Sequence, residues 1–214
     1  MHHDQTGTGL RYTGTIPLNI SRNFQFNGGW ANISGSSALG PVTLSGTISG
    51  PGGLFVDSSG EVVITGTNTG WSGPIRVNNG NIRISTDANL GTGMFDFGNG
   101  TAMGLILDGN WTTSRPINAS LTSGTLTFNT QGFNAVWNGP FSNGSLSITG
   151  TASDSFRKAG TGTLTVNAAG TFGTGTYGVI INASGGEIRF AQNGQWLANV
   201  YTVNTGGRLV LDNT

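Results

Sequence analysis

The chain has 214 residues, of which 38 are glycine and only 8% are charged, and its formal net charge is zero. A hydrophobic fraction of 35% excludes disorder driven by low hydrophobicity and high net charge, and the sparse, scattered cations exclude a basic nucleic-acid-binding surface. The absence of cysteine removes disulfides and thiolate metal sites.

The start of the chain carries no structural pattern. His2 and His3 are the only histidines and follow Met1, as in the remnant of an expression tag. No basic segment precedes an apolar one, and no apolar stretch approaches the ~20 residues needed to span a bilayer. We therefore expect residues 1–7 to be a disordered start or tag remnant, residues 8–214 to form one continuous domain, and this segment not to insert into a membrane.

Short apolar runs then recur along the whole chain, separated by Gly, Asn, Ser and Thr. Such runs between turn-forming residues are typical of short strands. No window of helical length keeps a 3.6-residue apolar period without a glycine, which costs roughly 1 kcal/mol inside a helix. The sequence predicts an all-β protein, with candidate strands that include Ile16–Ile20, Val42–Leu44, Val62–Ile64, Ile75–Val77, Ile82–Ile84, Leu105–Leu107, Leu126–Phe128, Leu164–Val166, Val179–Ile181, Ile188–Phe190 and Leu209–Leu211.

An internal repeat organises these runs, with copies near residues 48–85 and 150–190. The offset between the copies grows from 102 to 106 residues, so insertions fall in the glycine-rich links and spare the strands. The matched residues are Leu54 with Phe156, Val62 and Ile64 with Leu164 and Val166, Ile75 and Val77 with Val179 and Ile181, and Ile82 to Ile84 with Ile188 to Phe190.

The residues of the second copy carry a family resemblance. Phe156 to Val166 reads FRKAGTGTLTV, and a Gly-Thr-Tyr-Gly segment and a Gly-x-Ile-x-Phe strand follow it. This order resembles the autotransporter-associated β-strand repeat, also called the passenger-associated transport repeat, of bacterial autotransporter passengers. The first copy has the same order, with Trp71 in place of the family's usual tyrosine.

Two architectures fit strands this short: a β-sandwich or barrel, or a parallel β-helix whose coils stack on one another. The repeat and the resemblance favour a right-handed single-stranded parallel β-helix, or β-solenoid, with the β-sandwich as the alternative. In the β-helix, alternate side chains point inward. The pattern then predicts that Glu61, Arg76 and Arg83 face water and that the following stack inside: Val62, Ile64, Ile75, Val77, Ile82 and Ile84.

Candidate sites are few. The histidines at the start of the chain leave no base for a catalytic triad. The nearest carboxylate pairs are Asp57 with Glu61 and Asp87 with Asp96, and we interpret them as solvated turn residues rather than a glycosidase pair. The tryptophans are too irregularly spaced for a sugar-stacking stripe, and Trp71 is expected to pack over a neighbouring coil; they are Trp30, Trp71, Trp111, Trp137 and Trp196. We expect no catalytic, cofactor-binding or metal-binding residues, and no cofactor.

The resemblance implies a non-enzymatic structural segment of an autotransporter passenger, which forms a rigid stalk and aids translocation by folding progressively. It also implies export through the periplasm to the extracellular space or the outer-membrane surface of a Gram-negative-type bacterium. A self-assembling or adhesive filament protein that stacks end to end is the alternative, and a polysaccharide-binding or polysaccharide-cleaving β-helix is a further one. The partners expected are other copies through the end rungs, or a host-surface protein or glycan, and no nucleic acid.

Overall fold

The computed structural model describes most of the chain. The described residues are 9–12, 16–35, 40–98, 100–118, 120–121, 124–141, 145–148, 155–168, 171–172, 179–181, 186–191 and 201–212. Residues 1–7, part of the second repeat copy and Trp196 lie outside them.

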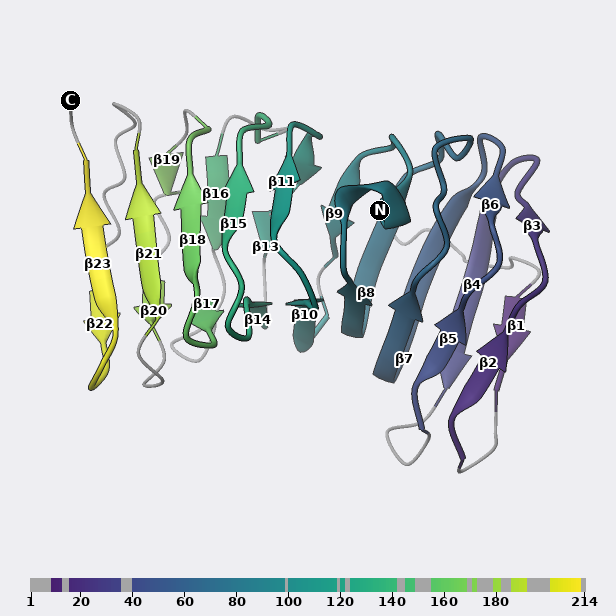
Figure 1. Cartoon of the computed structure of the whole chain (residues 1–214), viewed down its shortest axis with the longest axis horizontal. Helices are drawn as coiled ribbons and strands as arrows, with labels where there is room; N and C mark the ends of the chain where they lie inside the picture. Colours follow the sequence, from purple (N-terminus) through teal and green to yellow (C-terminus); the bar gives the residue numbers. More distant parts are fainter. Residues whose placement is uncertain are drawn as a thin grey trace.

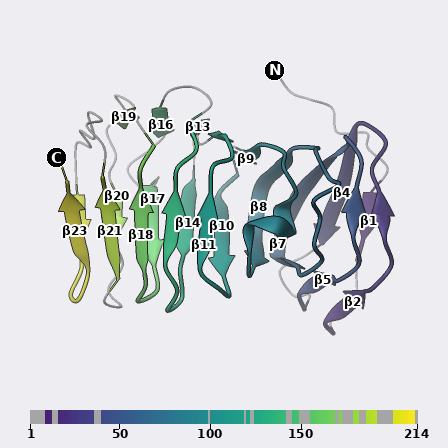
Figure 2. The same cartoon turned by 45° about the horizontal axis from the view of Figure 1, so that its top comes forward.

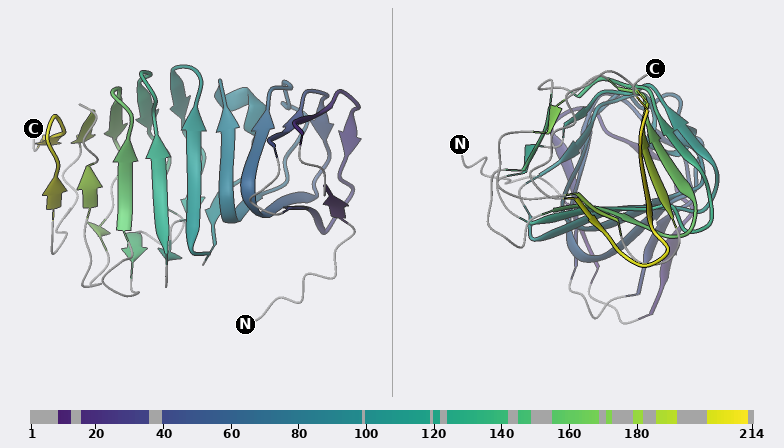
Figure 3. Two further views of the ribbon diagram at one scale, coloured as in Figure 1. Left: turned by 90° about the horizontal axis from the view of Figure 1, so that it is seen from below. Right: turned by 90° about the vertical axis from the view of Figure 1, so that its left-hand side faces the viewer.

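The described strands coil into a parallel β-solenoid. All the strand pairs between described residues are parallel. The coils stack from β1 to β3 at one end to β22 and β23 at the other (Figures 1 and 2). Viewed along its axis the solenoid has a roughly triangular outline (Figure 3). The prediction of a parallel β-helix is confirmed, and the sandwich alternative is wrong.

The strands lie on three sides of the solenoid. The first side contains β1 (Gly9–Arg11), β4 (Trp30–Gly35), β9 (Phe95–Phe97), β12 (Ile117–Asn118), β13 (Ser120–Leu121), β16 (Ser145–Ile148) and β19 (Thr171–Phe172). The second contains β2 (Leu18–Ile20), β5 (Val42–Leu44), β10 (Ala102–Leu107), β14 (Thr125–Asn129), β17 (Ser155–Ala159), β20 (Val179–Ile181) and β22 (Tyr201–Val203). Two longer strands, β7 (Gly53–Ile64) and β8 (Ile75–Ile84), cross from the first side to the second.

The third side contains β3 (Phe24–Gln25), β6 (Ile48–Ser49), β11 (Trp111–Thr113), β15 (Ala135–Trp137), β18 (Thr163–Val166), β21 (Glu187–Phe190) and β23 (Arg208–Leu211). The short 3-10 helix η1 (Asp87–Leu90) precedes β9, and the described residues contain no α-helix. This agrees with the high glycine content, which disfavours helix.

Inward side chains of successive coils lie in register and form the core. The six residues expected inside, Val62, Ile64, Ile75, Val77, Ile82 and Ile84, are all buried. Strand pairing extends one register column along the second side through nine positions: Leu18, Val42, Val62, Ile82, Leu105, Phe128, Lys158, Ile181 and Val203. Each coil therefore covers the apolar side chains of the next, which is the main source of stability in a solenoid.

The alternate side chains point outward, as predicted, and pair between coils. Arg83 binds the Glu61 carboxylate of the preceding coil at 2.7 Å and the Asp108 carboxylate of the following coil at 2.7 Å. Hydrogen bonding to Glu61 raises the pKa of Arg83 further above its ordinary value. Arg76 bonds to Asp96 of the next coil through Nε at 2.6 Å. These partly exposed ion pairs join neighbouring coils, although each contributes little free energy in water.

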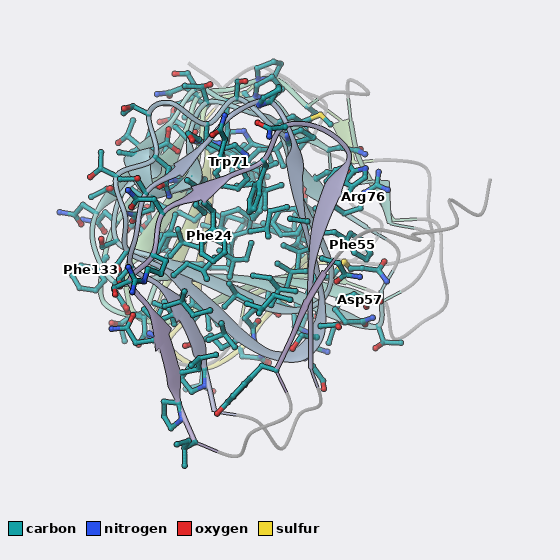
Figure 4. The ribbon with its side chains drawn as sticks, turned by 90° about the vertical axis from the view of Figure 1, so that its right-hand side faces the viewer. Phe24, Phe55, Asp57, Trp71, Arg76 and Phe133 are labelled. Carbon is teal, nitrogen blue, oxygen red and sulfur yellow. The ribbon has the colours of Figure 1, made fainter. Side chains whose placement is uncertain are left out.

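A buried corner on the third side is held by an asparagine ladder. The Asn68 side chain accepts a hydrogen bond from the Ile48 amide at 2.6 Å and donates one to the Asn89 carbonyl at 2.6 Å. Next to it, Trp71 is fully buried and donates from Nε1 to the Gly52 carbonyl at 2.8 Å. Figure 4 shows Trp71 and Phe24 pointing into the interior. The expected packing of Trp71 over a neighbouring coil is confirmed.

The two repeat copies have the same pairing on different sides. Leu54 pairs with Ile75 as Phe156 pairs with Val179, and Val62 pairs with Ile82 as Leu164 pairs with Ile188. The first copy occupies the first and second sides, whereas the second copy occupies the second and third. The equivalence of the two copies also extends to a third coil, which the sequence repeat did not include. There β10 pairs with Ile82 and Ile84 in the same way as β23 pairs with Ile188 and Phe190.

Candidate binding groove

A double irregularity in strand pairing opens a groove at the corner between the first and second sides. Val56 pairs with Val77 and Asp57 with Asn79, so Asn78 is extra in β8. Glu61 then pairs with Asn81, so β7 has two more residues than β8 between these pairs. Such bulges bend a strand and redirect its side chains. Asp57 and Ser59 lie outward at this corner and alternate with the buried Val56 and Ser58.

The groove lies over four successive coils and has a volume of about 510 Å³. Its lining is mostly polar and comes from β7, β8, β10 and β14 and the residues next to them. The lining residues are Asp57, Ser59, Asn79, Gly80, Asn81, Thr101, Ala102, Met103 and Thr127. Figure 4 shows Asp57 on the outer side of the ribbon, on the same side as Phe55 and Arg76.

A hydrogen-bonded cluster forms one wall of the groove. The Oδ1 atom of Asp57 accepts from Nδ2 of Asn79 at 2.7 Å and from Nδ2 of Asn78 at 3.3 Å. Oδ1 of Asn79 in turn accepts from the Thr101 amide at 3.0 Å and from the Thr101 hydroxyl at 3.3 Å. These bonds fix the Asn79 amide, and they leave the second carboxylate oxygen of Asp57 without a partner among the described residues.

The floor of the groove follows one outward register row: Asn81, Gly104 and Thr127. Gly104 has no side chain, and the space beside it is occupied by the Asn81 amide, whose Oδ1 would lie 2.2 Å from a Cβ atom at position 104. Within the described part of the chain, the Asn81 side chain has no hydrogen-bond partner. A half-buried amide with free donors and acceptors is therefore presented at the bottom of the groove.

The side chains that line the groove can make hydrogen bonds, but they do not include the nucleophile and base of a catalytic triad. The lining contains one carboxylate, amides and hydroxyls, with no imidazole or thiol. The described residues contain no group of three or more His, Cys, Asp or Glu side chains placed to hold a metal ion. The lining offers hydrogen-bond donors and acceptors to a polar ligand.

The two carboxylate pairs singled out from the sequence have separate roles. Asp57 and Glu61 both lie in β7, so their interpretation as solvated turn residues is wrong. Asp57 lines the groove, whereas Glu61 is bound to Arg83. Asp87 accepts from Trp111 Nε1 at 3.0 Å and pairs with Arg115 at 3.1 Å.

The interpretation of Asp96 as a solvated turn residue is wrong. Asp96 lies in β9, is only 2% exposed, and is bound by Arg76 and by the Asn118 amide at 2.8 Å. It points outward from its strand, but the side chains of the neighbouring coils cover it.

The described tryptophans form no sugar-stacking surface. Trp71, Trp111 and Trp137 are buried in the core. Trp30 lies on the outside of β4 and makes an edge contact with Phe55, with the Arg76 guanidinium 5.5 Å from its ring centroid.

Two buried cations were missed by sequence reasoning. Lys158 is fully buried in the register column of Val62 and Ile82, and its ammonium donates to the Ala159 and Gly160 carbonyls at 3.0 and 2.8 Å. Burial lowers the pKa of Lys158 to about 8. The alternation of Phe156, Arg157 and Lys158 was the available signal, since it places the lysine on the inward face.

Arg115 is the second buried cation. It is 6% exposed and donates to the carbonyls of Gly93 at 2.8 Å and Gly91 at 2.9 Å, in addition to its pair with Asp87. It holds the turn after η1 against the following coil and lies outside the groove.

Comparison with known proteins gives no match: no family model, no curated protein and no solved structure is significantly similar to this chain. Within the part of the chain that the structure describes, no helix has the length and apolar character needed to cross a bilayer.

Proposed function

We propose that this chain is a non-enzymatic structural segment of a bacterial surface or secreted autotransporter passenger, where it serves as a rigid stalk. The observation that supports the proposal is the unbroken register of coils on the second side, from β2 to β22. A stack in which each coil templates the next can add coils one at a time as a chain emerges from a pore. The resemblance of the two repeat copies to the passenger repeat supports the same role.

The test is surface display. The chain is placed between a signal peptide and an outer-membrane translocator barrel in a Gram-negative host, and its exposure is measured by protease accessibility on intact cells. We expect efficient display of the unchanged chain. Ile82→Asp, which puts a charge into the core column, should reduce display, whereas Thr43→Asp at an outward position should not. Equal display of the Ile82→Asp variant would contradict the role of progressive folding.

A second candidate is an adhesive filament that stacks end to end, and it makes a specific prediction about the last described coil. Val203 and Leu211 occupy core register positions in β22 and β23 but are 45% and 57% exposed. In an end-to-end filament, the first coil of another copy would cover these apolar side chains. Electron microscopy should then show fibres that depend on protein concentration and disappear in a Val203→Asp/Leu211→Asp variant. A monomeric sedimentation profile at all concentrations would exclude this candidate.

A further inference from the structure

We propose that the groove between the first and second sides binds a neutral polyhydroxylated ligand, namely a segment of an uncharged oligosaccharide. The groove would give the solenoid a ligand-binding site in addition to its structural role. The proposal depends on the groove geometry and does not depend on the autotransporter assignment.

The size and polarity of the groove suit such a ligand. Its volume of about 510 Å³ lies within the range of about 300–1,000 Å³ typical of small-molecule sites. Apart from Ala102, Met103 and the backbone of Gly80, the lining presents polar side chains. A peptide partner would bury apolar anchors in a complementary pocket, and this lining offers few apolar contacts for them.

The unsatisfied groups of the groove match sugar hydroxyls. A hydroxyl can donate and accept at once, and so can the Asn81 amide, which has no partner among the described residues. The free oxygen of Asp57 adds an acceptor, and the hydroxyls of Ser59 and Thr127 add donors and acceptors at either side.

The charge of the groove argues for an uncharged ligand. Asp57 is the one carboxylate in the lining, and it would repel sulfate or uronate groups. Arg83, in the outward row next to that of Asn81, is already paired with Glu61 and Asp108, so it does not offset this charge.

The site is also held rigidly before any ligand arrives. Asn79 is fixed by Asp57 and Thr101, and β7, β8, β10 and β14 are paired across the floor. Gly80 has a φ of 85°, and a Cβ there would lie 1.9 Å from the Ser58 carbonyl, so only glycine fits at this point of the bulge. Preorganisation of this kind lowers the entropic cost of binding.

The test is a titration of the full chain with three neutral trisaccharides: maltotriose, cellotriose and N,N′,N″-triacetylchitotriose. Binding is monitored through the side-chain amide signals of asparagine in NMR spectra. We expect at least one sugar to shift the Asn81 and Asn79 signals with a dissociation constant of about 1 mM or below. Asn81→Ala should weaken that binding about tenfold, as expected for loss of one or two hydrogen bonds. Gly104→Ala should weaken it similarly, because its methyl group displaces the Asn81 amide.

The matched control is Asn19→Ala, which removes an outward asparagine of β2 outside the groove and should leave the dissociation constant unchanged. Circular dichroism verifies that each variant keeps its strand content. The proposal is overturned if no sugar shifts the Asn81 signal at about 10 mM, if the shifts map elsewhere, or if folded Asn81→Ala and Gly104→Ala bind as tightly as the unchanged chain. A shift of the Asn81 signal by calcium chloride but by none of the sugars would also overturn it.

Discussion

Replacement of Asn68 by alanine would remove the buried amide that joins three coils. The Ile48 amide and the Asn89 carbonyl, each 2.6 Å from the Asn68 side chain, would both lose their partner. A buried polar group left unpaired costs about 1–3 kcal/mol, so the variant should lose about 2–6 kcal/mol of local stability. The backbone bond from Trp71 to the Asn68 carbonyl would remain, so the corner should loosen rather than unfold.

The assay is amide hydrogen exchange, because a solenoid can open locally without global unfolding. In Asn68→Ala the Ile48 amide should exchange at least about thirtyfold faster, because a loss of about 2 kcal/mol or more is divided by 1.4 kcal/mol for each factor of ten. Asn68→Asp keeps the size and the acceptor but sets an oxygen against the Asn89 carbonyl, so it should also exchange faster at neutral pH. Asn167→Ala, at an exposed asparagine pair, is the control. Unchanged Ile48 exchange in both Asn68 variants would refute the reasoning.

Three further predictions concern groups that link or shape coils. Burial lowers the pKa of Lys158 from 10.5 to about 8, so the unfolded chain binds the proton more tightly than the folded chain does. The urea concentration at the midpoint of unfolding should therefore rise between pH 8 and 10.5. This rise should be absent in Lys158→Met. Arg115→Met should lower the free energy of unfolding by about 3–5 kcal/mol in urea titration, because it leaves buried carbonyls without a donor and removes the ion-pair partner of Asp87. A loss below about 1 kcal/mol would contradict a structural role. Gly80→Ala should lower the midpoint temperature of unfolding and perturb the NMR signals of the groove, because its methyl group would clash with the Ser58 carbonyl. An unchanged midpoint temperature would show that the bulge can relax.

The inward and outward pattern of the strands could be predicted from the sequence alone. Alternation with a period of two assigned Val62 and Ile64 to the core and Glu61 and Arg83 to the outside, and the structure agrees. The repeat also identified the coil as the unit of stacking, because a pairing such as Val62 with Ile82 recurs as Leu164 with Ile188.

The groove could not be predicted, because it depends on a slip in register rather than on a residue pattern. Asp57 and Asn81 are 24 positions apart, and the sequence does not reveal the register shifts that set which residues of β7 and β8 lie opposite each other at the groove. The burial of Asp96 was likewise hidden, since the side chains that cover it belong to the preceding and following coils.

The shift of the repeat by one side has a geometric consequence for anything that recognises its surface. Equivalent residues of the two copies are separated by four steps along the strand order, from β7 to β17, and by one side of the triangle. Arg83 with Asp108 on the second side thus has its counterpart in Arg189 with Asp212 on the third. In a longer array built on this spacing, equivalent residues would wind around the rod like a screw thread, and only every third copy would present them in the same direction. A rigid bivalent partner could not bind two adjacent copies at once, because their equivalent residues would face different directions. Such a partner would have to wrap around the rod.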